Sequence, residues 1–208
     1  MEKLIANQSY HIFNHANGFE NVFNERENYR YFLEKYKEYI DPIAETYSYC
    51  LMPNHFHLVV RMRKREVIEE IISRNNFSKV EKNFGKVVSN EVIERYLSKQ
   101  FSNLFSSYTQ SYNKYLKRRG SVFIKNFKRD AIKDKEHFLN EIMYTHRNPI
   151  HHGFRTEYND WEFCSYYDIV NGKSELVEVD KLLKVFEGKD HFIALHSEYL
   201  EDWKCKFI

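Results

Sequence analysis

The sequence predicts an α+β fold, built as an antiparallel sheet with helices packed on one face. Strand patterns and helix patterns are interleaved along the 208 residues, a length that allows one domain with a core and an extra subdomain. The two central strand patterns are separated by so short a break that they form an antiparallel hairpin. A parallel pair would need a long crossover, so the hairpin favours this fold over a doubly wound parallel sheet.

The N-terminal part of the chain contains three strand patterns and one helix pattern. Residues 8–14 (QSYHIFN) are rich in aromatic and β-branched side chains, which favours a strand. Residues 27–40 place apolar side chains at helical spacing with charges between them, which predicts a helix. Residues 46–52 (TYSYCLM) and 55–62 (HFHLVVRM) predict the two hairpin strands, with a Pro-Asn turn between them.

The middle of the chain is less regular. Residues 63–98 are charged and show no single period, so we interpret them as an inserted segment of helical pieces and loop. Residues 99–119 show an amphipathic pattern that predicts a long helix, which Gly120 would end. Residues 121–132 set basic side chains among apolar ones and predict one or two strands.

A further helix is predicted after these strands. Asp134 is a suitable N-cap for a helix that runs to about Arg147. The pair Asn148-Pro149 is expected to end that helix, because the residue before a proline avoids the α region. Loops, a short acidic helix near residues 179–186 and a tail are expected after it.

Composition restricts the classes of protein to which the chain can belong. Three widely spaced cysteines without a CxxC pair indicate neither a disulfide framework nor a cysteine zinc site, which fits a reducing cytosol. The N-terminus has no apolar signal region, and no apolar run approaches membrane-spanning length. We therefore expect a cytoplasmic protein of the bacterial type, located at the nucleoid, with no membrane partner.

Positive charge is concentrated in one segment although the net charge is only +2. Residues 113–133 contain eight Lys or Arg and a single acidic residue, which is typical of a defined polyanion site. Tyr115, Phe123 and Phe127 lie among these charges and could stack on unpaired bases, although core positions are the commoner outcome. The candidate DNA-binding residues are Lys114, Lys117, Arg118, Arg119, Lys125, Lys128 and Arg129.

A histidine pair on the second hairpin strand is the first candidate for chemistry. Alternate side chains of a strand share a face, so His55 and His57 project together while Phe56 points into the core. Their imidazoles could converge on one cation, but a divalent cation needs further ligands from elsewhere in the chain. The alternative is that both are ordinary exposed strand residues, since this motif alone is a weak signal.

The second candidate is the segment YTHRNP. Tyr144 and Asn148 are four residues apart and therefore share one face of the predicted helix. A tyrosine beside a metal-held phosphate is a candidate nucleophile, and the Asn148 amide offers a neutral oxygen that suits Mg²⁺ or Mn²⁺. The alternative is also open, because the chain has 16 tyrosines and Asn-Pro commonly just ends a helix.

Several segments, taken in order, resemble the HUH-class single-tyrosine transposases, the family of REP-associated tyrosine transposases and insertion-sequence transposases. The segment YCLMPNHFHLVV is similar to their His-hydrophobe-His strand, and EIMYTHRNPIHHGF is similar to their catalytic helix with the pattern Tyr-x-x-x-Asn-Pro. The segments SYNKYLKRRGSVFIKNFKRDAI and DWEFCSYYD resemble their basic strand region and their later Trp…Ser-Tyr segment. The resemblance covers residues 10–168.

The resemblance implies a ferredoxin-like antiparallel sheet and a domain spanning residues 1–170. An insertion at about 63–98 and a C-terminal extension at 171–208 depart from the compact members. It also implies that His55, His57 and Asn148 ligate Mg²⁺ or Mn²⁺, and that Tyr144 is the nucleophile. The implied function is nicking and rejoining of single-stranded, hairpin-flanked DNA through a 5′-phosphotyrosine. Formation of a homodimer, with or without exchange of the tyrosine helix, is left open.

Two other functions are compatible with these residues. A metal-dependent hydrolase could use the same histidine pair with a bound water and would not need Tyr144. A non-catalytic or domesticated nucleic-acid-binding protein would bind DNA without cutting it and would be indifferent to loss of His57.

Overall fold

The computed structural model describes residues 2–74 and 88–207, and its centre is a four-stranded sheet in the order β2-β3-β1-β4. Every neighbouring pair of strands is antiparallel. The α+β prediction and the implied ferredoxin-like sheet are confirmed, since this strand order with a β2–β3 hairpin is that of the βαββαβ unit. The strands are β1 (Ser9–His15), β2 (Ala44–Met52), β3 (His55–Met62) and β4 (Lys128–Ala131).

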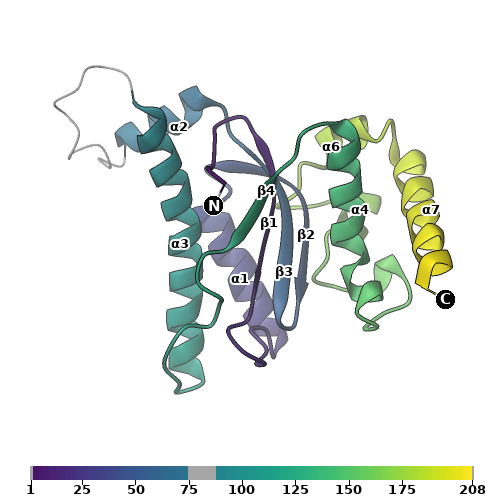
Figure 1. The fold of residues 1–208 in the computed structure, drawn as a ribbon, viewed down its shortest axis with the longest axis horizontal. Helices are drawn as coiled ribbons and strands as arrows, with labels where there is room; N and C mark the ends of the chain where they lie inside the picture. The colour runs from purple at the N-terminus through teal and green to yellow at the C-terminus, as the bar shows by residue number, and fades with distance from the viewer. Residues whose placement is uncertain (1, 75–87, 208) are drawn as a thin grey trace.

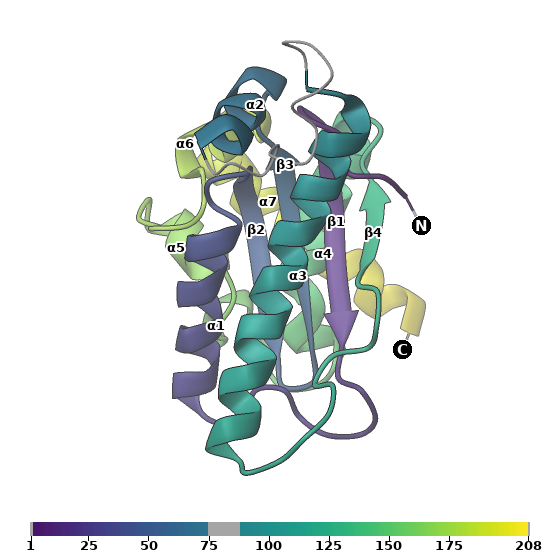
Figure 2. The same ribbon diagram turned by 90° about the vertical axis from the view of Figure 1, so that its left-hand side faces the viewer.

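One face of the sheet is covered by α1 (Arg26–Tyr39) and α3 (Asn90–Tyr115), which pack against each other (Figures 1 and 2). The aromatic side chains of this layer pack against the sheet and belong to the hydrophobic core. The Phe56 ring lies 5.3 Å from the Phe32 ring and 5.6 Å from the Phe105 ring, measured between centroids. As the alternation of β3 predicts, Phe56 therefore points away from the face that carries the two histidines.

The prediction that helices pack on one face only is wrong. Helix α4 (Lys135–His151) packs against β2 and β3 on the opposite face, as Figure 1 shows. Both faces of β2 and β3 are consequently buried. The rest of the chain lies around α4 and comprises η2 (Tyr158–Asp160), α5 (Tyr166–Val170), α6 (Val179–Val185) and α7 (Lys189–Phe207).

The region interpreted as an insertion contains helical pieces, as predicted, but α3 starts earlier than its apolar stripe suggested. Helix α2 (Arg65–Arg74) follows β3, and residues 75–87 lie outside the described residues. Helix α3 already begins at Asn90, where the Ser89 side chain accepts a hydrogen bond from the Val92 amide. Its last turn closes at Lys117, which adopts the left-handed conformation, so Gly120 does not end the helix.

The second predicted strand segment is mostly irregular. Of residues 121–132 only β4 pairs continuously with β1, while Phe123 makes an isolated bridge to Ala16. Asn126 has a φ of 66°, which breaks the extended run between these two pairings. Phe123 and Phe127 are both buried, so the core expectation is confirmed for them, whereas Tyr115 is exposed.

Helix α4 begins as predicted and ends later than predicted. The Asp134 carboxylate accepts a hydrogen bond from the His137 amide at 2.8 Å, which confirms the N-cap. Asn148-Pro149 does not end the helix, which continues through the proline to His151. The Asn148 side chain donates to the Tyr144 carbonyl at 2.9 Å and lies 3.5 Å from the Thr145 carbonyl, the group that a proline cannot serve.

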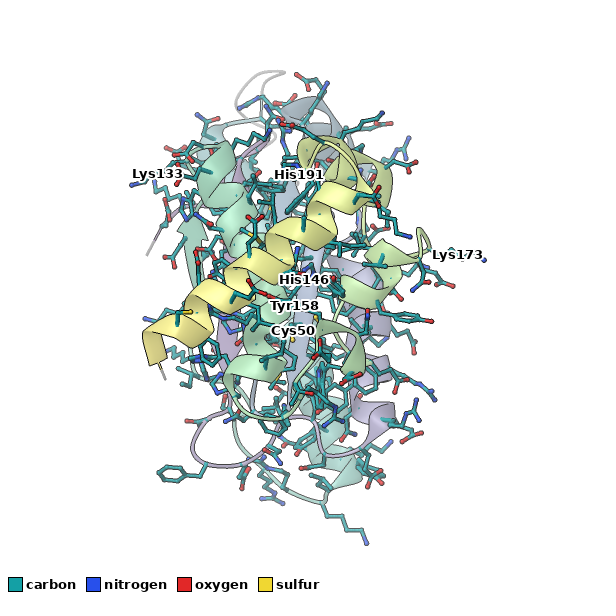
Figure 3. All side chains as sticks on the ribbon, turned by 90° about the vertical axis from the view of Figure 1, so that its right-hand side faces the viewer. Cys50, Lys133, His146, Tyr158, Lys173 and His191 are labelled. Atoms are coloured by element: carbon teal, nitrogen blue, oxygen red, sulfur yellow. The ribbon has the colours of Figure 1, made fainter. Side chains whose placement is uncertain are left out.

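The tail after α6 is a helix rather than an irregular segment. Figure 3 shows α7 crossing over α4, with His146 and Tyr158 beneath it. The His146 and His196 rings are hydrogen-bonded at 2.8 Å, and the Tyr158 hydroxyl donates to the His196 carbonyl at 3.0 Å. His196 Nδ1 in turn donates to the Phe192 carbonyl at 2.8 Å. These buried bonds attach α7 to the outer side of α4.

Within the described parts of the chain, none of the helices has the length and apolar character needed to cross a membrane.

Stability should fall as the pH drops below about 6.5, because two histidines under α7 are buried in neutral form. Burial lowers the pKa of His196 to about 3 and the pKa of His146 well below its usual range. The unfolded chain takes up protons that the folded chain refuses, which costs about 1.4 kcal/mol per pH unit for each such histidine. Urea unfolding between about pH 7 and pH 5 measures this slope.

The variant His196→Gln should reduce that slope by about one proton. Tyr158→Phe is the matched control, because it removes a neighbouring hydrogen bond without removing a histidine and should lower stability equally at each pH. An unchanged slope in His196→Gln would contradict the assignment.

Candidate active site

The two histidines of β3 lie together on the face that α4 covers. His55 is 3% exposed and His57 is 4% exposed, and their ring centroids are 5.3 Å apart. The shared face follows from strand alternation. Their burial differs from the alternative of ordinary exposed strand residues, because a polar ring is buried at a cost unless it has a partner.

Helix α4 brings Tyr144 and Asn148 to this histidine pair. The Tyr144 ring stands edge-on to the His57 ring at 5.3 Å, and Asn148 Oδ1 lies 3.3 Å from His55 Nε2. The helix spacing that puts Tyr144 and Asn148 on one face therefore also puts them on the sheet side of α4. The four residues singled out in the sequence meet at one place within a single chain.

The hydrogen bonds of His55 leave two acceptors facing each other. His55 Nδ1 lies 2.7 Å from Asn54 Oδ1, and an amide oxygen can only accept, so Nδ1 carries the proton. In a neutral ring, Nε2 then presents a lone pair towards Asn148 Oδ1. The Asn148 amide nitrogen is engaged by the Tyr144 carbonyl, which fixes the orientation of its oxygen. A cation between or beside these two atoms would satisfy both.

A second histidine and a glutamate lie behind His57. His11 Nε2 on β1 is 2.8 Å from His57 Nδ1, and His11 Nδ1 is 2.8 Å from Glu141 Oε2 on α4. His137 approaches the other oxygen of Glu141 at 3.4 Å. The sequence reasoning missed His11 and Glu141. The only local signals were the alternation of β1 and the position of Glu141 one helical turn before Tyr144.

Burial keeps the histidines of the site neutral at neutral pH. It lowers the pKa of His55 to about 4 and the pKa of His57 well below its ordinary range. Neutral imidazoles offer lone pairs, so a cation would bind without first displacing protons. Burial acts in the opposite direction on the phenol and raises the pKa of Tyr144, with Glu141 adding to the rise and Arg147 opposing it.

The donor set at this place would suit a divalent cation whose remaining positions take water or phosphate oxygens. It consists of two imidazole nitrogens and one amide oxygen, whereas a structural zinc site takes four protein ligands. Within residues 2–74 and 88–207, no cluster of three His, Cys, Asp or Glu side chains is arranged to hold a metal ion. Asn148, whose Oδ1 atom lies 3.3 Å from His55 Nε2, is the third candidate ligand beside His55 and His57.

The candidate DNA-binding residues fall into two groups. Four surround the end of α3, where Arg118 pairs with Glu20 at 2.5 Å and lies over the Tyr112 ring. The others lie in the segment that leads into β4 and along it. Exposed members of the two groups are Lys114, Lys117, Arg119, Lys125 and Lys128.

Arg129 does not face outward with the other basic residues. It is 8% exposed, donates to the Glu2 carbonyl at 2.5 Å and to Ser98 Oγ at 3.1 Å, and lies over the Phe127 ring. Because strand alternation turns it towards α3, its charge holds the N-terminal segment and α3 to β4. The prediction that it contacts DNA conflicts with this placement.

Lys128 brings the basic segment to the edge of the histidine face. It is the cross-strand partner of Phe13 on β1, and such partners project from the same face. The half-buried Phe13 ring is stacked 5.6 Å from the His57 ring, and the exposed His15 ring is stacked 4.9 Å from the His55 ring. Aromatic and basic groups therefore continue outward from the site along β1 and β4.

The remaining histidines near Tyr144 take different places. His146 faces α7, away from Tyr144, and hydrogen-bonds to His196 and Ser165, which confirms the predicted orientation and a structural role. His151 packs against Trp203 at the end of α4. The exposed His152 ring lies 4.9 Å from the His55 ring, at the open side of the site.

Comparison with known proteins supports the family resemblance. No family model matches the chain. A curated protein of Haemophilus influenzae, named provisionally as a REP-associated tyrosine transposase, is 22% identical over 138 residues. This match covers 65% of the chain and 65% of the relative, which is less than two thirds of the relative's length.

A solved structure of a REP-associated tyrosine transposase bound to a REP hairpin is similar to the chain in fold. The two share 15% sequence identity and superpose with a TM-score of 0.51, covering 86% of this chain and 87% of the other. At this identity the structural similarity supports the antiparallel α+β fold. The sequence match is to a protein named for the class that the motifs indicate.

The guanidinium of Arg147 should be what limits the rise of the Tyr144 pKa. It lies 5.8 Å from the centroid of the Tyr144 ring and favours the phenolate. Arg147→Met keeps the apolar stem and removes the charge, so the Tyr144 pKa should rise further. Titration of ¹³C-labelled tyrosine by NMR measures this pKa, with Tyr144→Phe identifying the resonance.

Arg147→Lys, which keeps the charge, should leave the Tyr144 titration close to that of the unmodified protein. A midpoint that falls in Arg147→Met, or that does not move, would show that the charge does not act on Tyr144.

Proposed function

We propose that this chain is a tyrosine transposase of the REP-associated type, which nicks and rejoins single-stranded DNA beside a hairpin. The observation that carries the proposal is the meeting of four side chains from β3 and α4: His55, His57, Tyr144 and Asn148. The resemblance of several segments in family order and the similarity to REP-associated tyrosine transposases support it. Because the four residues belong to one chain, the proposed site needs no second subunit.

His55, His57 and Asn148 would hold Mg²⁺ or Mn²⁺, a proposal supported by the 3.3 Å between His55 Nε2 and Asn148 Oδ1. The ion would neutralise charge on the scissile phosphate when bound. The protein's own contribution is orientation. Asn54 fixes the His55 ring, and the backbone of α4 fixes the Asn148 amide. Burial keeps water from competing for these donors.

Tyr144 would act as the nucleophile. Its phenolic oxygen would attack phosphorus in line, forming an oxygen–phosphorus bond and breaking the bond to the 3′-oxygen, which leaves as a 3′-hydroxyl after taking a proton. The phenol proton passes to solvent or a nearby base. The resulting 5′-phosphotyrosine keeps the energy of the phosphodiester, so a second 3′-hydroxyl can attack it and reseal the strand without ATP.

The raised pKa of Tyr144 means that the free enzyme holds a neutral phenol. A bound cation would favour the phenolate, which links nucleophile activation to occupation of the site. Covalent phosphotyrosine chemistry would thus give the half-buried Tyr144 a role, whereas attack by a bound water would not need it.

The DNA strand would reach this site along β1 and β4. Lys128 and Lys125 supply charge at that edge, and Phe13 and His15 supply aromatic faces for unpaired bases. Lys114, Lys117 and Arg119, at the end of α3, would contact the double-stranded part of a hairpin. A protein that acts on such DNA would be located at the nucleoid.

Tyr144→Phe should abolish the covalent link to DNA, because it removes the attacking oxygen and little else. Labelled single-stranded DNA beside a REP-type hairpin is incubated with Mn²⁺, and a denaturing gel reads both cleavage and the protein–DNA adduct. We expect cleavage to fall on the order of 10³-fold or more, with no adduct. Tyr167→Phe, on the exposed side of α5, is the matched control and should behave as the unmodified protein.

The two competing functions predict other results. Cleavage that persists in Tyr144→Phe, with no adduct in the unmodified protein, would establish a water-using hydrolase. Binding without cleavage in Mg²⁺ or Mn²⁺, unchanged by His57→Gln, would establish a non-catalytic binding module.

Removing Lys125 and Lys128 together should weaken DNA binding and reduce its dependence on salt. Each lost phosphate contact lowers the slope of log affinity against log salt by about 0.7 for single-stranded DNA. Fluorescence anisotropy at several salt concentrations measures the slope. Lys173→Ala, in the loop after α5, removes an exposed charge elsewhere and should leave the slope unchanged. Equal slopes for both variants would place the DNA path elsewhere.

A further inference from the structure

We propose that His11 and Glu141 are positioning residues, which fix the ring proton of His57 on Nδ1 so that Nε2 is free to ligate the cation. The proposal rests on the cation site of the proposed function. It adds two residues that the motifs do not contain, one from β1 and one from α4.

The first step is the contact between the two histidines. His11 Nε2 lies 2.8 Å from His57 Nδ1, and the exposed fractions of the two residues are 5% and 4%. At this distance one nitrogen carries a proton and the other accepts it. Water has little access to a pair this buried, so neighbouring protein groups determine which nitrogen donates and which accepts.

Glu141 determines which nitrogen of His11 carries the proton. Its Oε2 atom lies 2.8 Å from His11 Nδ1, where its negative charge favours an N–H over a lone pair. The contact is electrostatic rather than a well-aligned hydrogen bond, since Oε2 is buried without a hydrogen-bond partner. With its proton on Nδ1 and its lone pair on Nε2, His11 accepts at Nε2. His57 must therefore donate from Nδ1, which leaves the lone pair on Nε2.

The ring proton of His55 is fixed in the same way, but by a different partner. Asn54 Oδ1 accepts from His55 Nδ1, so both rings keep Nε2 for a ligand. Fixing the tautomer of a ligand histidine through its second nitrogen is a general feature of metal sites. His57 differs because its partner is a histidine that a carboxylate orients from across the sheet-helix boundary.

Glu141 and Asn148 flank Tyr144 on the sheet side of α4, so one helix carries three roles. Glu141 sets His57 through His11, Asn148 faces His55, and Tyr144 lies between them in sequence. Docking of α4 on its own sheet would thus prepare the histidine pair at the same time as it delivers the nucleophile.

The test compares His11→Leu with His11→Gln. Gln places an amide oxygen near the position of the imidazole Nε2 and can accept from His57, whereas Leu cannot. In metal-free protein at neutral pH, ¹⁵N NMR of labelled histidine should show the His57 proton on Nδ1 in the unmodified protein and in His11→Gln. In His11→Leu the proton should be distributed over both nitrogens.

Affinity for Mn²⁺, measured by calorimetry, gives a second readout independent of cleavage. We expect binding about 10- to 100-fold weaker in His11→Leu and close to the unmodified value in His11→Gln. Glu141→Leu should reproduce the tautomer shift from a less buried position, in case His11→Leu folds poorly. His137→Gln, which changes the neighbour at the other oxygen of Glu141, should match the unmodified protein in both measurements.

A His57 proton on Nε2 in the unmodified protein would overturn the proposal. Unchanged Mn²⁺ affinity in a folded His11→Leu variant would also overturn it. Loss of affinity in Glu141→Gln, with normal binding in His11→Leu, would overturn it too, because that pattern would make Glu141 a direct ligand. Absence of any Mn²⁺ binding by the unmodified protein would instead sink the cation site of the proposed function, while the metal-free tautomer would still decide the role of His11.

Discussion

The arrangement of the site depends on how α4 docks on the histidine-bearing face of the sheet. Two polar contacts mark the register of that docking. Asn148 faces His55 at one end of the contact, and Glu141 faces His11 at the other. A shift of α4 by one residue would turn these groups away from each other, so that the Asn148 oxygen no longer faced His55 and the Glu141 charge no longer faced His11. The same register sets Tyr144 against His57.

Local rules of strand and helix geometry make much of this structure predictable from the sequence. The hairpin and the bounds of β3 follow from strand alternation and a tight turn, and the start of α4 follows from the Asp134 cap. The shared faces of His55 with His57, and of Tyr144 with Asn148, need only the periods of strand and helix. That the two faces meet was supplied by the family resemblance, because neither period says which elements pack together.

Other features depended on contacts between distant segments. The proposed role of His11 depends on the pairing of β1 with β3, and the proposed role of Glu141 depends on the docking of α4. Arg129 was grouped with solvent-facing basic residues because a charge run in a sequence carries no information on which member turns inward. Helix α4 outlasts Asn148-Pro149 because the Asn148 side chain bonds to the preceding turn and the sheet and α7 hold the helix on both sides. The presence of helices on both faces of the sheet was missed for the same reason, because the residue spacing of α4 does not show which element it packs against.

The two sides of α4 show why burial alone does not identify a functional histidine. Under α7, every ring nitrogen of His146 and His196 has a protein partner, and the pair is a closed structural network. On the sheet side, His55 is equally protected from water, yet its Nε2 faces the Asn148 oxygen, and two acceptors cannot satisfy each other. The residue type, the burial and the lowered pKa are shared by both sides. What separates them is whether the fold supplies a donor for each acceptor, and only the sheet side leaves a place that a cation would complete.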